Sequence, residues 1–215
     1  MIDNDGIFRY SNLVEAEKLA SALLAQTGSR GEAQKLIGEI RMEQKRYPEA
    51  VAAYRAAHAA SPDSDSLFGL YGALMAASQP RDAAALMSQW RQRYPDDRAA
   101  GHALGEAWLA LKDYPRARSV YQALVASDAK DARAHNNLAQ VQLQLQDLPA
   151  ALKHAEQARA LAPNQPQVND TLGWVLVQQG QFEKGLRYLR EASLRAPDAP
   201  QIPAHLQQTL SRMGR

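Results

Sequence analysis

Small and larger apolar residues recur along the chain with a period close to 34 residues. In each period an apolar residue is followed directly by a small residue or alanine: Ile37-Gly38, Tyr71-Gly72, Leu104-Gly105, Leu138-Ala139 and Leu172-Gly173. Further along, a small residue stands four positions before another apolar one: Ala50 and Tyr54, Ala83 and Met87, Ala117 and Tyr121, Ala151 and Ala155, Gly185 and Leu189. Residues four apart lie on one face of a helix, so each period predicts a pair of antiparallel helices.

Prolines mark the ends of these predicted helices. Pro163 and Pro197 are 34 residues apart, Pro62 and Pro95 are 33 apart, and Ala129 stands where the series predicts another proline. Other prolines fall where the second helix of a unit begins: Pro48, Pro80, Pro115 and Pro149. Proline is tolerated there because the first N–H groups of a helix have no intrahelical acceptor. We therefore predict five tandem units, 31–64, 65–97, 98–131, 132–165 and 166–199.

Two further segments flank the five units. Residues 12–26 have the spacing of a second helix, which predicts that Ala16, Leu19, Leu23 and Leu24 face inward. Residues 200–215 read as a first helix, with one apolar stripe formed by Leu206, Leu210 and Met213. Its polar outer face suits a capping helix, and a helix cut short before its partner fits equally well.

Glycine occupies the same place in several of the predicted first helices, at Gly38, Gly72, Gly105 and Gly173. In a helix interior glycine costs about 1 kcal/mol relative to alanine. Its recurrence predicts a position where two helices pack too closely for a side chain.

The period and its residues resemble the tetratricopeptide repeat (TPR), a 34-residue helix–turn–helix unit. The match extends over the five units. It implies an all-α fold, a right-handed superhelical solenoid of antiparallel helix pairs in which stacked neighbours bury each other's apolar faces.

Composition narrows the possible functions. The chain of 215 residues is 46% hydrophobic and 22% charged, as in ordinary soluble domains, and its net charge of +2 gives no reason to expect nucleic acid as a partner. It contains no cysteine, which excludes thiol catalysis, cysteine zinc sites and disulfides. No apolar run reaches the roughly 20 residues of a transmembrane segment. The first residues, MIDNDGIFRYSN, lack the features of a signal peptide, so an exported natural protein would imply that this chain is a fragment.

No pattern of residues indicates catalysis. The five histidines, at 58, 102, 135, 154 and 205, form no HxxxH or HExxH pair, and no P-loop, GxSxG or GxGxxG occurs. Carboxylates between the units, such as Asp63, Asp65, Asp96 and Asp97, are typical of helix caps. We expect no enzyme, no cofactor and no metal site.

The first helices of a TPR stack line its concave face, the surface that solenoids use for binding. Residues four apart on a helix, or one period apart along the chain, fall in common rows on that face. The rows of the C-terminal half carry amide, aromatic and charged groups: His102, Glu106, Arg133, Asn136, Gln140, Gln167, Asp170 and Trp174. We predict that these residues bind a protein or peptide segment. The alternative is that Asn136, Gln140 and Trp174 only bridge neighbouring helices.

Longer strings, above all LAPNQPQVNDTLGWVLVQQGQ and the ending HLQQTLSRMGR, resemble the C-terminal region of bacterial TPR proteins of exosortase (PEP-CTERM) systems. The resemblance implies a longer, exported protein in the periplasm or at the outer membrane, tied to exopolysaccharide production and surface-protein sorting. If the resemblance is wrong, we expect a cytoplasmic location. A second hypothesis follows, in which the amides, Asp170 and Trp174 bind exopolysaccharide directly.

Overall fold

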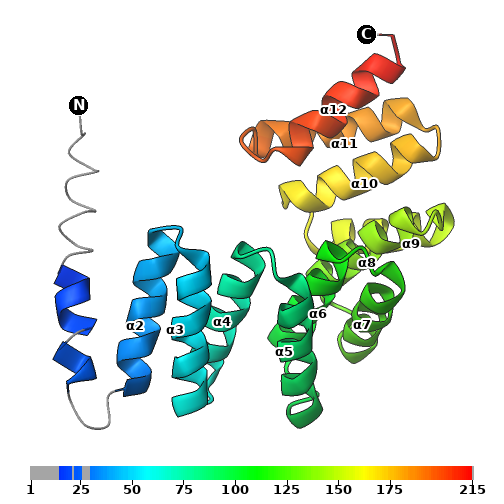
Figure 1. Cartoon of the computed structure of the whole chain (residues 1–215). Coiled ribbons are helices and arrows are strands. Elements are labelled where there is room, and N and C mark those ends of the chain that lie inside the picture. Colours follow the sequence, from blue (N-terminus) through cyan, green and yellow to red (C-terminus); the bar gives the residue numbers. More distant parts are fainter. Residues whose placement is uncertain (1–14, 21, 26–29, 215) are drawn as a thin grey trace, which may run out of the picture. The chain divides into compact units, whose positions relative to one another are not determined.

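A computed structural model describes residues 15–20, 22–25 and 30–214, and throughout these residues the regular structure is helical, without a strand (Figure 1). The chain divides into two compact units, an N-terminal unit, Met1–Arg93, and a C-terminal unit, Tyr94–Arg215. This confirms the all-α fold.

Each unit is a series of helices that pack on their neighbours in chain order. The N-terminal unit contains α2 (Arg30–Glu43), α3 (Tyr47–Ala60), α4 (Ser64–Ala76) and α5 (Pro80–Arg93). The C-terminal unit contains α6 (Arg98–Ala110), α7 (Tyr114–Ser127), α8 (Ala132–Gln144), α9 (Leu148–Leu161), α10 (Pro166–Gln178), α11 (Phe182–Arg195) and α12 (Gln201–Arg212). Even-numbered helices are the first helices of a pair, and odd-numbered ones are the second.

Aspartates fix where many of these helices begin. Each accepts a hydrogen bond from the backbone N–H three residues further on, which satisfies a donor that the helix itself leaves without an acceptor. These caps are Asp63 on α4, Asp97 on α6, Asp113 on α7, Asp131 on α8 and Asp147 on α9. Two of the carboxylates interpreted as caps, Asp63 and Asp97, are therefore caps.

The turn between the two helices of a pair contains a residue with left-handed backbone. These residues have φ between 57° and 80°: Lys45, Ser78, Lys112, Gln146 and Gly180. Only Gly180 is the residue type that this conformation favours, so the sequence did not reveal the left-handed backbone at the other four turns.

Glycines allow close contact between helices, although not at every predicted position. A Cβ atom on Gly38 or Gly105 would lie less than 3 Å from the ring of Tyr54 or Tyr121 on the following helix. One on Gly173 would lie 2.8 Å from Leu189 Cγ and 2.9 Å from the Gly185 carbonyl oxygen. The prediction for Gly72 is wrong, because nothing lies within 4 Å of its Cβ position.

The neighbouring Gly69 has the role that we assigned to Gly72. A Cβ atom on Gly69 would also lie less than 3 Å from Tyr54. The Tyr54 ring therefore contacts Gly38 on α2 and Gly69 on α4, and its size requires a glycine on both helices.

The flanking segments differ in part from their prediction. In the N-terminal segment Ala20 is buried, whereas Leu19 and Leu24 are 55% and 43% exposed, so the inward assignment of these two leucines is wrong. Residues 12–14, 21 and 26 lie outside the described residues. In α12 the fully buried residues are Ile202 and Thr209, while the predicted stripe of Leu206, Leu210 and Met213 is half-buried. The stripe therefore lies beside the centre of the surface by which α12 packs on α10 and α11, and not at that centre.

Candidate binding groove

The first helices of the C-terminal unit enclose a pocket of about 460 Å³. Its lining combines apolar and polar side chains from α6 to α12: Leu109, Lys112, Tyr114, Gln140, Leu143, Gln144, Asp170, Thr171, Trp174, Gln201 and His205. Three of the predicted site residues, Gln140, Asp170 and Trp174, are among them. The structure therefore brings these three together around one cavity.

Asp170 and His205 form the charged centre of this pocket. His205 Nδ1 lies 2.9 and 3.0 Å from the two carboxylate oxygens of Asp170, so its N–H donates to the carboxylate. Asp170 is 4% exposed, and a buried carboxylate needs such a partner because burial without one is costly. Sequence reasoning did not assign His205 to the groove, because it lies 35 residues beyond Asp170 and so misses the 34-residue period by one.

Trp174 both bridges neighbouring helices and lines the pocket, the two alternatives that the sequence left open. Its ring stacks on His205, with centroids 4.3 Å apart and planes 10° from parallel. The guanidinium carbon of Arg212 lies 5.3 Å from the indole centroid. Trp174 is half-buried and also lines the pocket. It therefore joins α10 to α12 and offers surface to a ligand.

Gln140 and Gln167 take part in a chain of hydrogen bonds. Gln140 Nε2 donates to Thr171 Oγ1 at 3.1 Å, and the Thr171 hydroxyl donates to the backbone carbonyl of Gln167 at 2.9 Å. Gln140 thus bridges α8 and α10, as the structural alternative required, and it lines the pocket as well. The Gln167 side chain is exposed but does not line this pocket.

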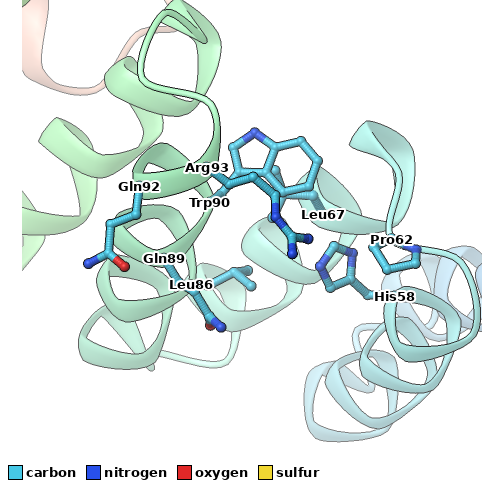
Figure 2. A pocket seen from close by; sticks show the side chains of 8 residues that line it. All are labelled: His58, Pro62, Leu67, Leu86, Gln89, Trp90, Gln92 and Arg93. Carbon is cyan, nitrogen blue, oxygen red and sulfur yellow. The ribbon is translucent and has the colours of Figure 1, made fainter.

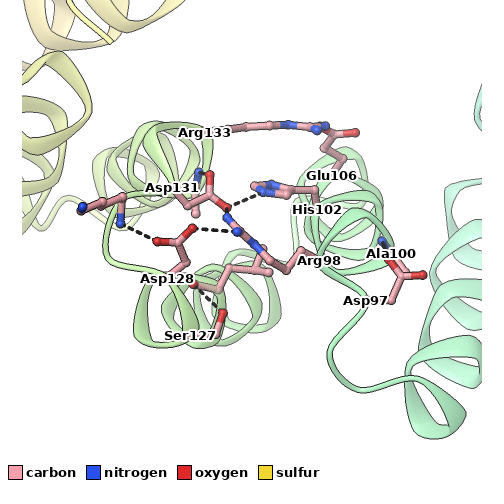
Figure 3. A network of polar contacts seen from close by, with 12 residues as sticks. Asp97, Arg98, Ala100, His102, Glu106, Ser127, Asp128, Asp131 and Arg133 are labelled. Atoms are coloured by element: carbon pink, nitrogen blue, oxygen red, sulfur yellow. Dashed lines mark hydrogen bonds and ion pairs between the residues drawn. The ribbon is translucent and has the colours of Figure 1, made fainter. Parts of the chain in front are cut away.

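The predicted site residue His102 is instead part of an ion-pair network between α6 and α8 (Figure 3). It is 6% exposed, and its Nε2 lies 2.8 Å from Asp131 Oδ2. Arg98 Nη2 lies 2.7 Å from the same Asp131 oxygen, and Arg98 Nη1 lies 2.7 Å from Asp128 Oδ2. The prediction that His102 lines a binding surface is wrong, because the side chain is enclosed by this network.

Asp131 stays ionised within the network. Burial raises the pKa of Asp131, but the Ala134 backbone N–H and the side chains of Arg98 and His102 outweigh it and lower the pKa to about 2. Since Asp131 also caps α8, one carboxylate both starts this helix and attaches it to α6.

The remaining predicted site residues lie on the same two helices. Arg133 on α8 forms an ion pair with Glu106 on α6 (Figure 3). Asn136 is 6% exposed, and its Nδ2 donates to Asn137 Oδ1 at 3.5 Å, so its assignment to the groove surface is wrong. None of these three residues lines the pocket of the C-terminal unit.

A second pocket, of about 570 Å³, lies in the N-terminal unit (Figure 2) and contains no predicted site residue. Among the described residues, no group of three or more His, Asp or Glu side chains could hold a metal ion. None of the described helices combines the length and the apolar character needed to span a membrane.

Comparisons with known proteins agree with the helical pattern. Family models described as tetratricopeptide repeat match residues 11–65, 73–132, 112–166 and 142–208. A comparison with curated protein sequences gives no significant match.

Solved structures share the fold at low sequence identity. The thermophilic TPR protein TTC0263 of Thermus thermophilus is 19% identical, with a TM-score of 0.68 over 84% of this chain and 98% of that one. MamA residues 41 to the end, from Desulfovibrio magneticus RS-1, are 18% identical, with a TM-score of 0.67 over 81% and 99%. Another MamA structure gives 18% identity and a TM-score of 0.64, over 81% and 96%. Such identities show the fold alone. With repeat models covering most of its length, the chain belongs to the tetratricopeptide repeat family.

Proposed function

We propose that the chain is a non-enzymatic scaffold whose C-terminal unit binds a segment of a partner protein in the pocket between α6 and α12. The observation that carries this proposal is the Asp170–His205–Trp174 cluster, which is held in place by its own contacts and forms one wall of a 460 Å³ cavity. Cavities of this size are typical of ligand pockets.

The lining fits a peptide segment better than a small metabolite. Leu109, Leu143 and the indole of Trp174 provide apolar surface for one or two side chains. Gln140 and Gln144 carry amides that can donate to and accept from the backbone of an extended segment. Aromatic anchors flanked by amides are common at the centres of protein interfaces.

The side chains of the proposed site are preorganised in the absence of a partner. Asp170 and Trp174 are both fixed by His205, so a bound segment would order few side chains of the scaffold. Preorganised sites lose less conformational entropy on binding.

A photo-crosslinking experiment tests the groove. p-Benzoylphenylalanine replaces Gln144, which is exposed and lines the pocket, or Arg118, an exposed residue of α7 outside it. In extract of the host cell we expect a discrete crosslinked partner from position 144 alone, and expect Leu143→Asp to abolish it. Equal crosslinking from both positions, or crosslinking that survives Leu143→Asp, would show that the pocket is not the binding site.

Direct binding of polysaccharide, the other hypothesis, has less support. Sugar rings bind by stacking on an aromatic face, and His205 already covers one face of Trp174. Titration with the host polysaccharide, followed by the fluorescence of Trp174, distinguishes the two hypotheses.

On the resemblance to exosortase-system proteins alone, we propose that the scaffold acts in the periplasm or at the outer membrane during exopolysaccharide production and surface-protein sorting. Neighbouring exosortase and polysaccharide-synthesis genes would support this placement. A neighbourhood of cytoplasmic metabolic genes would contradict it.

A further inference from the structure

The pocket of the N-terminal unit lies between the C-terminal halves of α3 and α5, with Leu67 of α4 in its wall (Figure 2). His58, Pro62, Leu86, Trp90 and Arg93 also line it, together with two glutamines. Its volume of about 570 Å³ lies within the range of ligand pockets. No acidic side chain contributes to the lining.

Trp90 is an unusual residue for its place in the repeat. Counted from the first residue of each second helix, the same place holds Ala57, Leu124, Ala158 and Ala192, which are all at most 2% exposed. Trp90 is only half-buried. An indole is too large for a position that alanine fills in three other repeats, so the ring stays at the surface and forms a wall of the pocket.

Arg93 supplies the charge of the pocket. Its side chain extends from α5 toward α3, with the guanidinium directed toward His58 (Figure 2). Within the described residues this guanidinium has neither an ion pair nor a hydrogen bond, whereas Arg41 and Arg46 of the same unit both pair with Glu49. A guanidinium with five unused donors favours an anion of planar shape.

His58 is held in one orientation at the other side of the pocket. Its Nδ1 lies 2.9 Å from Ser66 Oγ, and that hydroxyl lies 3.1 Å from each of the carbonyl oxygens of Ser61 and Asp63. Because carbonyl oxygens only accept, the hydroxyl donates to one of them and accepts from His58 Nδ1–H. Burial lowers the pKa of His58, although the charge of Asp63 opposes this effect. The neutral ring therefore leaves Nε2 as an acceptor for a ligand N–H.

We propose that this pocket binds an internal acidic segment of a partner protein, in which an aspartate or glutamate stands beside a large apolar residue. The carboxylate pairs with Arg93, the apolar side chain packs on Trp90 and Leu86, and a backbone N–H of the segment donates to His58 Nε2. This site is separate from the groove of the C-terminal unit and does not depend on the function proposed for it.

Two capped dipeptides test the charge requirement. Acetyl-Phe-Glu-amide and acetyl-Phe-Gln-amide differ only by the carboxylate. Binding is followed with the full chain by NMR, through the indole N–H signals of Trp90, Trp108 and Trp174, which are assigned from Trp→Phe variants. We expect the glutamate peptide to shift the Trp90 signal saturably, with a Kd at least fivefold lower than that of the glutamine peptide.

Charge-matched variants connect the effect to Arg93. Arg93→Gln should remove the preference for glutamate, while Arg81→Gln, an exposed arginine at the other end of α5, should keep it. Circular dichroism establishes that both variants fold. Equal affinity for the two peptides, an unchanged preference in Arg93→Gln, or no shift of Trp90 at 20 mM peptide (about the weakest binding that the assay detects) would each overturn the proposal. N-acetylphenylalanine, which carries a terminal carboxylate, is the third ligand tested. If it bound more tightly than acetyl-Phe-Glu-amide, the pocket would favour a chain terminus over an internal segment, against the proposal.

Discussion

Trp174 on α10 and His205 on α12 stack face to face, 4.3 Å apart, while His205 also donates to the buried carboxylate of Asp170. One imidazole thus satisfies a charge and covers an aromatic face. Through these two contacts α12 completes the wall of the candidate pocket, so the docking of α12 and the shape of the pocket depend on each other.

Replacement of His205 should therefore affect both stability and the site. His205→Ala leaves Asp170 buried without its partner, and loss of a hydrogen bond to a charged group costs about 1.5–3 kcal/mol. We expect a lower midpoint in urea and a red shift of Trp174 fluorescence. Gln207→Ala, at an exposed position of the same helix, is the control and should change neither. An unaltered midpoint for His205→Ala would mean that the contact contributes nothing to docking.

Two glycines that share a repeat position should respond to alanine in opposite directions. Gly173→Ala brings a methyl group to 2.9 Å from the Gly185 carbonyl oxygen, and overpacking of this kind costs about 1–3 kcal/mol. Gly72→Ala adds a methyl group in open space within α4, so the gain in helix propensity of up to about 1 kcal/mol remains. Thermal melts of the two variants check this, and a stabilised Gly173→Ala would contradict the packing described for α10 and α11.

The Asp131 network predicts a dependence of stability on acid. The pKa of Asp131 falls from 3.8 to about 2 on folding, so its contribution is complete above pH 4 and is lost as the pH falls toward 2. The shift corresponds to about 2 kcal/mol. We expect Asp131→Asn to be less stable than the parent at pH 7, with a difference that shrinks below pH 4. Urea titrations across this range measure it, and a difference independent of pH would exclude ionisation as its cause.

A second dependence on pH comes from His135 and His154, whose Nδ1 atoms lie 2.9 Å apart. One ring must donate and the other accept, so the contact requires a ring that is not fully protonated. Burial, followed by the charges of His135 and Lys153, lowers the pKa of His154 below 6.5. The unfolded chain then binds the proton more readily, and stability should fall as the pH drops below about 6.5.

His154→Gln provides the matched variant for this prediction, since a glutamine amide accepts or donates without titrating in this range. Urea midpoints at pH 7.5 and pH 5.5 should differ less for this variant than for the parent. If the parent and the variant lost the same stability, the effect would come from other groups. His58 is one of these, because burial also lowers its pKa.

The fold could be predicted because its determinants are local and repeated. Small residues four apart and prolines at helix starts recur often enough to define helix pairs, and the structure has helices there. The residues of the candidate site were predicted only in part. Gln140, Asp170 and Trp174 line the pocket, whereas His102 and Asn136 are buried away from it, because a repeat position does not reveal which neighbouring side chains enclose a residue.

Other features escaped prediction because they depend on single contacts. Asp131 attracts His102 only because it caps α8 beside that side chain. His205 reaches Asp170 from a position one residue outside the period. The left-handed turn residues Lys45, Ser78, Lys112 and Gln146 carry no sequence signal, since the surrounding helices impose a conformation that these residues do not favour.

The double role of Asp131 also bears on how the C-terminal unit comes apart. In a repeat array, stability is a sum of terms within repeats and coupling terms between neighbours. Between α6 and α8, part of the coupling comes from the Asp131 carboxylate, which also caps the first turn of α8. Fraying of that turn and separation of the two repeats are therefore linked. Protonation of this single group, at a pH near 2, would weaken the first turn of α8 and its attachment to α6 together.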